Sequence, residues 1–266
     1  MDNKSLSISI NYFKGEYSMN IVVVGGTGGI GSALIRELSL KNNIYIGSRI
    51  KTNIDNLINN LSLTNDIKNN NIISGNLVDA QSFDSMKLFL SSANNFLGSI
   101  DCVINCVGSV LLKPAHLTSE DDLDDVIKTN FYSCFSILKY GFKYLKKTEG
   151  SIVFFSSAAS KVGLKNHEAI SSAKAAVSAL ALSGASTYAK YNIRINAIAP
   201  GLVDTPLTKH ITSNDMSLDY SKKLHGLGRI GNPDNFIPII KALIDKRSDW
   251  ITGQTFSVDG GLSNIK

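Results

Sequence analysis

The sequence predicts an α/β protein in which one parallel sheet is covered by helices on both faces. Short apolar runs alternate with longer helical patterns from residue 20 onward, which is typical of repeated strand-helix-strand units. The runs are nearly continuous in Val, Ile and Phe, as expected for strands that are buried on both faces. With 43% hydrophobic and 18% charged residues among 266, the chain can form one large core, and general disorder is excluded.

Seven apolar runs are predicted as the strands. They are Ile21–Val24, Ile44–Ile46, Ile72–Ile73, Cys102–Ile104, Ile152–Phe155, Ile193–Ile198 and Thr255–Val258. Right-handed crossovers between parallel neighbours then give a single-domain, doubly wound Rossmann fold with a seven-stranded parallel sheet over residues 19–266. The polar stretch 52–71 is predicted as a loose helix and connection. Residues 1–18 are predicted as an N-terminal extension, in which the alternation Ser5–Ile10 would suit an edge strand.

Neither composition nor charge predicts a nucleic-acid or membrane partner. The 27 basic and 22 acidic residues leave a net charge of +5, but Lys and Arg are scattered and form no basic stripe. No run approaches the roughly 20 apolar residues of a membrane helix, and no secretion signal opens the sequence. Cys102, Cys106 and Cys134 follow no zinc-ligand spacing, so we expect free thiols, no metal site and a cytoplasmic location.

A glycine-rich loop follows the first predicted strand and runs into a helical pattern. Gly25, Gly29 and Gly31 follow the spacing G-x-x-x-G-x-G. A helix N-terminus presents unpaired N–H groups and partial positive charge, so a loop without side chains lets a pyrophosphate approach closely. A flexible turn is the alternative, but the strand-loop-helix context favours a dinucleotide site. The residues expected there are Gly25, Thr27, Gly29, Ile30 and Gly31.

The end of the second predicted strand indicates which dinucleotide binds. An acid at this place bonds the ribose 2′-hydroxyl, whereas a base accommodates a 2′-phosphate. The sequence Ile46-Gly47-Ser48-Arg49 contains no acid, and a hydroxyl with a guanidinium suits a phosphate. Ser48 and Arg49 therefore favour NADP(H) over NAD(H), although Arg49 can also be read as an ordinary surface residue.

From Asn20 to the C-terminus, the sequence resembles the short-chain dehydrogenase/reductase family. The glycine loop is similar to the family's T-G-x-x-x-G-x-G, with Val24 at the Thr position. The other matching segments are Asn76–Asp79, Asn105–Gly108, Lys128–Asn130, Asn196–Thr205 and Ile251–Gly261. The resemblance implies further cofactor-binding residues, which are Asn76 and Leu77 at the adenine, Asn105, Val107 and Gly108 after the fourth strand, Lys174, and Pro200, Gly201, Val203 and Thr205 at the nicotinamide carboxamide. Asn76 stands where the family has Asp, and it still offers an acceptor.

The catalytic centre departs from the family pattern at one position. Members end the fifth strand in a Ser and carry, thirteen residues later, the Tyr of Y-x-x-x-K. Here Ser157 and Lys174 match, but Ile170 stands at the Tyr position. In the mechanism that the resemblance implies, the phenol gives its proton to the carbonyl oxygen as hydride arrives, and an isoleucine cannot do this.

Two interpretations follow from this departure. In the first, the chain is a catalytically disabled dinucleotide-binding protein with a regulatory or structural role, against which the retained Ser157, Lys174 and Asn130 argue. In the second, His167 is a substitute acid, because it precedes Lys174 by seven residues, nearly two helical turns. The enoyl-acyl-carrier-protein reductase branch of the family carries its Tyr at that spacing. Alternatively, His167 only opens the helix after Asn166 caps it.

The resulting prediction is an NADPH-dependent reductase of a ketone or an activated alkene. Lys174 would bind the ribose hydroxyls, Ser157 would polarise the substrate oxygen, Asn130 would order a water, and His167 or that water would donate the proton. The predicted helix from Glu168 to Lys190 is rich in Ala, Ser and Gly, through which family members assemble, so a homodimer or homotetramer is expected. The polar connection from Thr205 to Pro233 is where the family has its substrate lid.

Overall fold

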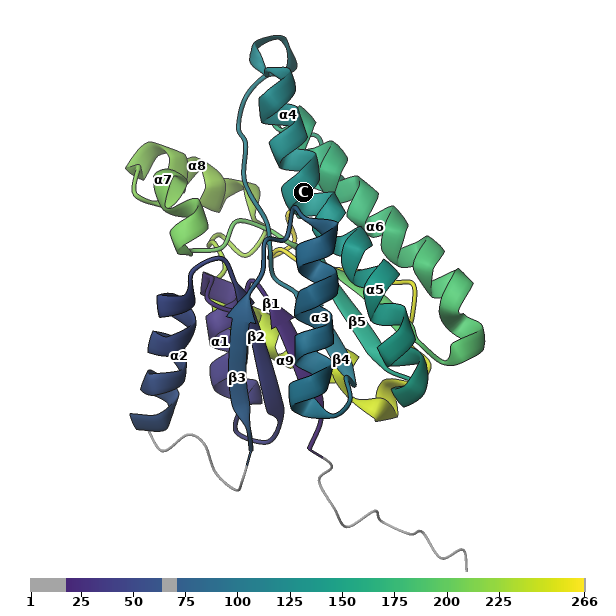
Figure 1. Cartoon of the computed structure of the whole chain (residues 1–266). Coiled ribbons are helices and arrows are strands. Elements are labelled where there is room, and N and C mark those ends of the chain that lie inside the picture. The colour runs from purple at the N-terminus through teal and green to yellow at the C-terminus, as the bar shows by residue number, and fades with distance from the viewer. Residues whose placement is uncertain (1–17, 64–70, 266) are drawn as a thin grey trace, which may run out of the picture.

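The computed structural model describes residues 18–63 and 71–265, and its centre is one parallel sheet (Figure 1). The seven strands are β1 (Asn20–Val24), β2 (Asn43–Ser48), β3 (Ile73–Leu77), β4 (Cys102–Asn105), β5 (Ser151–Phe155), β6 (Arg194–Pro200) and β7 (Thr255–Val258). Their spatial order is β3-β2-β1-β4-β5-β6-β7, and every neighbouring pair is parallel. The predicted seven-stranded Rossmann-like sheet is confirmed. The alternation at residues 5–10 lies outside the described residues.

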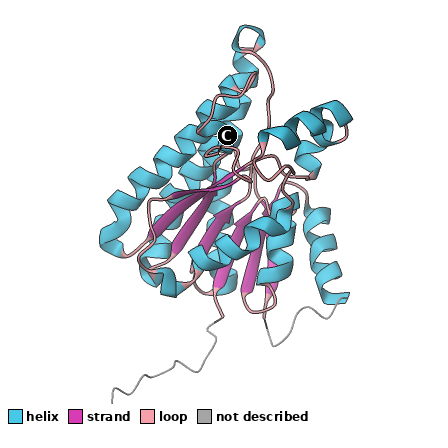
Figure 2. Cartoon of the chain, turned by 180° about the vertical axis from the view of Figure 1, so that it is seen from behind, coloured by secondary structure: helices cyan, strands magenta, loops and turns pink. Residues whose placement is uncertain are grey.

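A layer of helices covers each face of the sheet (Figures 1 and 2). One layer consists of α1 (Gly29–Leu38), α2 (Lys51–Leu63) and α9 (Ile237–Ile244), and the other of α3 (Phe83–Leu97), α5 (Ser133–Thr148) and α6 (Glu168–Tyr188). Alternate residues of β1 join the two cores: Ile21 and Val23 pack under the first layer, Val22 and Val24 under the second. Burial on both faces therefore explains the continuous apolar runs of the central strands.

The strand order reverses between β1 and β4, and this reversal places the candidate site. The connections from these two neighbours depart in opposite directions, so a crevice opens beyond their carboxyl ends. The segments that follow β1, β4, β5 and β6 all leave the sheet at this edge. The helices α4 (Glu120–Ile127), α7 (Lys209–Thr212) and α8 (Asp215–Leu224) lie beyond the same edge (Figure 1).

Two segments differ from the sequence-based expectation. The apolar pattern predicts the third strand at Ile72–Ile73, but the strand extends to Leu77, because an edge strand that is only partly buried tolerates polar residues. Gly75 in this strand lies against β2, where a Cβ would come within 2.5 Å of the Ile46 carbonyl oxygen. The connection from 205 to 233 contains the helices α7 and α8, which have no buried residue. Within the described ranges, no helix is long and apolar enough to cross a membrane.

Packing of α3 against the sheet and α5 predicts a large difference between two leucines of the same helix. Leu90 is fully buried in the core, whereas the side chain of Leu88 is 70% exposed. We expect Leu90→Ala to lower the free energy of unfolding by about 2–5 kcal/mol, through lost burial and the cavity left behind. The matched change Leu88→Ala should cost less than about 0.5 kcal/mol. Urea denaturation of both variants checks this, and equal losses would contradict the packing.

Candidate active site

A cavity of about 460 Å³ lies at the crevice, and the glycine loop forms one wall of it. Gly25 has a φ of +76°, a conformation that suits glycine, and a Cβ there would lie 2.8 Å from the Val107 backbone nitrogen. A Cβ on Gly31 would clash with the Gly25 carbonyl oxygen, so the first turn of α1 closes tightly on the loop. The loop thus presents backbone at the N-terminus of α1, which suits a pyrophosphate.

Most of the predicted cofactor-binding residues meet around this cavity. Those that line it are Gly25, Thr27, Gly29, Ile30, Gly31, Ser48, Arg49, Val107, Gly108 and Thr205. The Thr27 and Ser48 hydroxyls are hydrogen-bonded at 2.7 Å, which joins the glycine loop to the end of β2. Ser48 is buried and Arg49 is exposed at the rim. Further lining residues, absent from the prediction, are Gly28, Ile50, Asn53, Val78, Asp79, Ala80, Gln81, Cys106, Thr129, Pro206 and Leu207.

Seven predicted cofactor residues do not line this cavity: Asn76, Leu77, Asn105, Lys174, Pro200, Gly201 and Val203. Asn76 and Leu77 are exposed just before the lining stretch Val78–Gln81, and the Asn76 Oδ1 accepts the Leu77 N–H. Asn105 is fully buried and acts on the loop instead, since its Oδ1 accepts the Val107 N–H at 3.2 Å. Val203 is also buried, and its carbonyl accepts a hydrogen bond from the Thr208 hydroxyl.

A second cavity, of about 650 Å³, lies between the ends of β5 and β6 and the helices α7 and α8. Ser157, His167 and Ile170 line it on one side, and Pro200 and Gly201 on another. Its wall is mainly apolar, and the charged or titratable residues among the described lining are Lys165, His167, His210, Tyr220 and His225. The segment after β6 reaches both cavities, because its later residues Thr205–Leu207 line the first one.

Ser157 and Ile170 occupy neighbouring walls of the second cavity with different surroundings. The Ser157 Oγ accepts the Ala159 N–H at 3.2 Å, which leaves its own proton for an oxygen in the cavity. Ile170 is only 5% exposed and packs with Val126 and Ala173 in a small apolar cluster. The position that Ile170 occupies therefore offers shape to a ligand and no proton.

Lys174 lies below the surface between the two cavities. Its Nζ donates to the Phe155 carbonyl oxygen at 2.8 Å, and burial lowers the pKa of Lys174 to about 8. A Cβ on Gly108 would be 3.3 Å from both this Nζ and the Asn130 Oδ1. Both polar groups thus converge behind Gly108, a residue in the wall of the first cavity.

Asn130 is held by an irregular turn. Residues Lys128–Tyr132 form one π-helical turn between α4 and α5, a feature that is frequent at functional sites. The fully buried Asn130 amide donates to the Val126 carbonyl at 2.8 Å and to the Ser109 hydroxyl at 2.9 Å. Its Oδ1 accepts the Ser109 N–H at 3.2 Å and retains one lone pair on the side of Lys174.

His167 lines the second cavity, but it precedes the helix that carries Lys174. His167 is the N-cap of α6, whereas Lys174 lies within the helix, is buried beneath Phe155 and lines neither cavity. The expectation that the side chains of His167 and Lys174 share one helical face is therefore wrong. The expectation that Asn166 caps the helix is also wrong, because Asn166 is an exposed residue with a φ of +63° and makes no cap bond. The His167 Nδ1 lies 2.7 Å from the Lys165 carbonyl oxygen. Since a carbonyl only accepts, Nδ1 carries a proton.

Comparison with known proteins assigns the family. The family model described as enoyl-(acyl carrier protein) reductase matches residues 45–263. A tropinone reductase homologue of Arabidopsis thaliana, named as chloroplastic, is 31% identical over 92% of this chain and 76% of its own length. This chain belongs to the short-chain dehydrogenase/reductase family. Its oxidoreductase fold is shared with a short-chain type dehydrogenase/reductase from Mycobacterium ulcerans, at a TM-score of 0.87 and 23% identity over 94% of this chain and 92% of the other. A solved structure of ElxO with NADP bound matches at a TM-score of 0.83 and 27% identity, covering 92% and 99% of the two chains.

Burial of Lys174 makes the stability of this dehydrogenase/reductase fold depend on pH. Because the folded pKa of about 8 lies below the unfolded value of 10.5, folding releases the lysine proton between these values, and stability rises with pH across that window. From pH 7 to pH 9, the protein should gain about 1 kcal/mol relative to Lys174→Met, in which the titration is removed. Urea denaturation of both forms at the two pH values measures the difference. A gain that is the same in both forms would contradict the buried, desolvated amine.

Proposed function

We propose that this protein is an NADP(H)-dependent oxidoreductase that reduces a ketone or an activated alkene. The observation that carries the proposal is the shared segment after β6, which lines a phosphate-binding crevice with Thr205 and a mainly apolar cavity with Pro200 and Gly201. A ligand that extends from the glycine loop along this segment ends beside Ser157. When bound, NADPH supplies the hydride, and the protein has to orient the acceptor and provide a proton.

Discrimination between the two dinucleotides is assigned to the end of β2. Ser48 and Arg49 line the cavity there, and Asn53 on α2 adds an amide to the same wall. The acid in this wall is Asp79, which follows β3, and its carboxylate accepts the Gln81 N–H. A guanidinium with a neighbouring hydroxyl and amide favours a 2′-phosphate over a 2′-hydroxyl. The NADP bound to the structural neighbour ElxO is consistent with this preference.

The chain's own residues divide the remaining work. Ser157 would donate to the substrate oxygen and polarise it, and Lys174 would bind the ribose hydroxyls beside Gly108, where no side chain covers its Nζ. The pKa of about 8 leaves Lys174 charged at neutral pH, so its ammonium has donors left after the bond to Phe155. Asn130 would order a water beside it through the free lone pair of its Oδ1.

The proton is assigned to His167, because Ile170 stands where the family has its tyrosine and offers none. With its Nδ1 proton held by the Lys165 carbonyl, a neutral His167 exposes the Nε2 lone pair, which accepts hydrogen bonds. His167 can therefore act as an acid only as an imidazolium, and it lines the cavity where the substrate would bind. As hydride reaches the acceptor carbon, the Nε2 proton passes to the substrate oxygen or α-carbon, and solvent reprotonates the ring.

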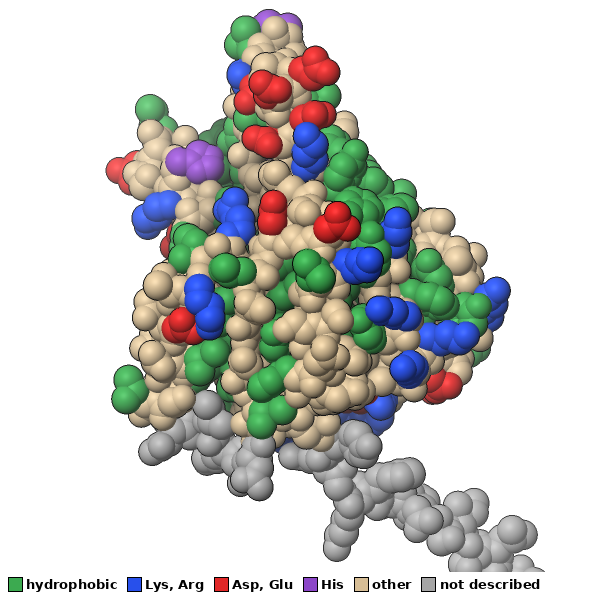
Figure 3. Space-filling model, in the orientation of Figure 1, with side chains coloured by type: hydrophobic (Ala, Val, Ile, Leu, Met, Phe, Trp, Pro, Cys, Tyr) green, Lys and Arg blue, Asp and Glu red, His purple; other side chains and the backbone are tan. Residues whose placement is uncertain are grey.

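We also propose that the protein is a homodimer or homotetramer in the cytoplasm. Figure 3 shows hydrophobic side chains gathered over α5 and α6. On these helices, Phe135 of α5 is 41% exposed and Leu182 of α6 is 63% exposed, and the small residues of α6 allow another helix to approach closely. The cytoplasmic assignment rests on Cys102, Cys106 and Cys134, which form no disulfide.

Cofactor preference tests the proposal directly. We expect NADPH to bind more tightly than NADH, and Arg49→Ala to weaken NADPH binding by about 1.5–3 kcal/mol while leaving NADH binding nearly unchanged. The matched control is Lys51→Ala. This change removes a positive charge two residues after Arg49, from a side chain that is paired with Asp55. Isothermal titration calorimetry of the three forms with both dinucleotides gives the comparison. Tighter binding of NADH by the unmutated protein would contradict the assignment.

The role of His167 predicts a kinetic change without a binding change. In single-turnover reduction of an accepted ketone or enone, His167→Ala should lower the rate by about 10²–10⁴, whereas the dissociation constant of NADPH should stay the same.

Two further variants separate this role from a general effect on the cavity. His210→Ala removes another histidine from the same wall and should retain most of the rate. Ile170→Tyr, introduced together with His167→Ala, should restore carbonyl reduction by returning a phenol to the cavity wall near Lys174. A loss of less than tenfold in His167→Ala would assign the proton to water instead.

A further inference from the structure

The helices α7 and α8 are attached to the protein mainly at their two ends. Neither helix contains a buried residue, so packing along their length contributes little. The residues at the two ends are buried instead: Thr208 before α7 is 8% exposed, and His225 after α8 is 4% exposed. Both are polar, and both bond to the same short segment after β6.

At the entry, Thr208 is part of a local turn. Its hydroxyl accepts the Thr205 N–H at 3.1 Å and donates to the Val203 carbonyl. These partners are within five residues in sequence, so this anchor forms wherever the turn forms. The exit is different, because His225 lies 23 residues from its partner Leu202 and joins two separate parts of the chain.

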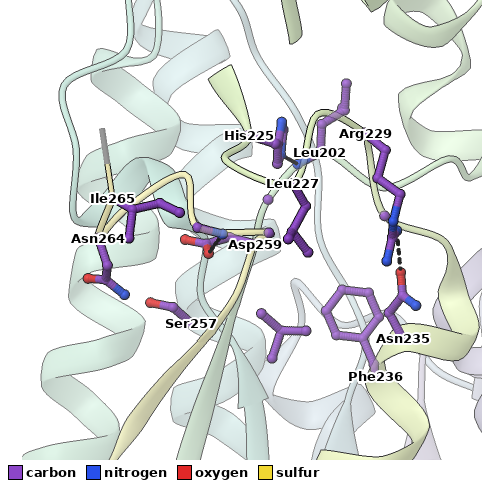
Figure 4. Close-up of a pocket in the computed structure, with 15 residues that line it drawn as sticks. Leu202, His225, Leu227, Arg229, Asn235, Phe236, Ser257, Asp259, Asn264 and Ile265 are labelled. Atoms are coloured by element: carbon purple, nitrogen blue, oxygen red, sulfur yellow. Dashed lines mark hydrogen bonds between the residues drawn. The ribbon is translucent and has the colours of Figure 1, made fainter. Parts of the chain in front are cut away.

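His225 uses both nitrogens of its ring. The Leu202 N–H donates to its Nε2 at 3.1 Å, and its Nδ1 lies 2.7 Å from the Ser221 carbonyl in the last turn of α8 (Figure 4 shows the bond to Leu202). A backbone N–H only donates and a carbonyl only accepts, so Nδ1 carries the proton and Nε2 does not. The geometry fixes one neutral tautomer.

Gly201 makes room for this ring, and Gly260 packs against it. A Cβ on Gly201 would lie 2.5 Å from the His225 Nε2, which is too close for any side chain. On the other side, a Cβ on Gly260 would be 3.6 Å from the His225 Cβ, so the ring lies between the end of β6 and the turn after β7. Gly201, predicted as a cofactor-binding residue, therefore has a second reason to be glycine. His225 also separates the substrate cavity from a further cavity of about 470 Å³, because it lines both (Figure 4).

We propose that His225 is a positioning residue that holds α8 and the segment Gly201–Leu202 in register across the substrate cavity. The inference rests on the proposed function, because Gly201 and Leu202 line that cavity with Ser157. With the ring in place, the end of α8 and the nicotinamide end of the site keep a fixed separation. Without it, the Leu202 N–H loses its partner, and α8 loses its bond to the segment after β6.

Amide hydrogen exchange tests the anchor without substrate or cofactor. We expect His225→Ala to speed exchange at Leu202 and across residues 215–224 by about tenfold, the loss of one buried hydrogen bond, while the central strands stay protected. His225→Gln places an acceptor near the site of Nε2 and should restore protection at Leu202. His210→Ala, on the same lid and exposed, should match the unmutated protein. Unchanged exchange in His225→Ala, or equal acceleration in His210→Ala, would overturn the proposal.

Two measurements complete the test. In the unmutated protein, the ¹⁵N shifts of His225 should show protonated Nδ1 and unprotonated Nε2, and the opposite tautomer would overturn the proposal even if the variants fail to fold. With an accepted substrate, His225→Ala should raise KM by about tenfold, with a smaller change in kcat, and His225→Gln should recover most of it. A protein that binds no NADPH refutes the proposed function, whereas the exchange and tautomer results still decide the anchor.

Discussion

The segment that follows β6 holds the candidate site together, because both cavities and the helices α7 and α8 depend on its position. Its Gly201 end lines the apolar cavity, and Thr205 lines the crevice at the glycine loop. The contact with that loop is close, since a Cβ on Gly29 would lie 2.7 Å from the Thr205 side chain. A shift of the segment by about 1 Å would therefore disturb the crevice at the glycine loop, the apolar cavity and the helices α7 and α8 together, and such shifts are costly in catalysis.

A buried lysine imposes the second constraint. Across the described ranges, Lys174 forms no salt bridge, and its neighbours Cys106 and Cys134 are thiols whose own pKa values are raised by burial, in the case of Cys106 to about 12. Neutral thiols do not balance the ammonium, so the charge is stabilised mainly by the Phe155 carbonyl. A polar ligand beside Gly108 in the crevice would improve this environment, which is a physical reason for the lysine to favour bound ribose hydroxyls over an empty crevice.

The fold and the phosphate crevice could be predicted from the sequence, because they depend on local patterns. Because the central strands are buried on both faces, each of them appears in the sequence as an apolar run. Residues 25 and 31 have to be glycine because neighbouring backbone atoms lie too close for a Cβ. The second cavity could be predicted less well from the sequence, because tertiary contacts determine which residues line it. The helices α7 and α8 contain no buried residue. The turn before α6 places His167 off the helical face of Lys174, and His225 meets Leu202 only after folding. The motif at residues 105–108 predicts Asn105 as a cofactor-binding residue. Its spacing does not reveal that Asn105 is buried and instead holds the loop through the Val107 N–H.

Hydride transfer is the central claim, and isotope transfer measures it most directly. NADPH deuterated at C4 of the nicotinamide would be incubated with the protein and a panel of ketones, aldehydes, enones and enoyl thioesters, and the products analysed by mass spectrometry. We predict deuterium at carbon in at least one reduced product, with a rate at least about 10²-fold lower in Lys174→Ala. Tight binding of NADPH with no deuterium in any product would contradict hydride transfer, and would identify the protein as a dinucleotide-binding member of the family that has lost the chemistry.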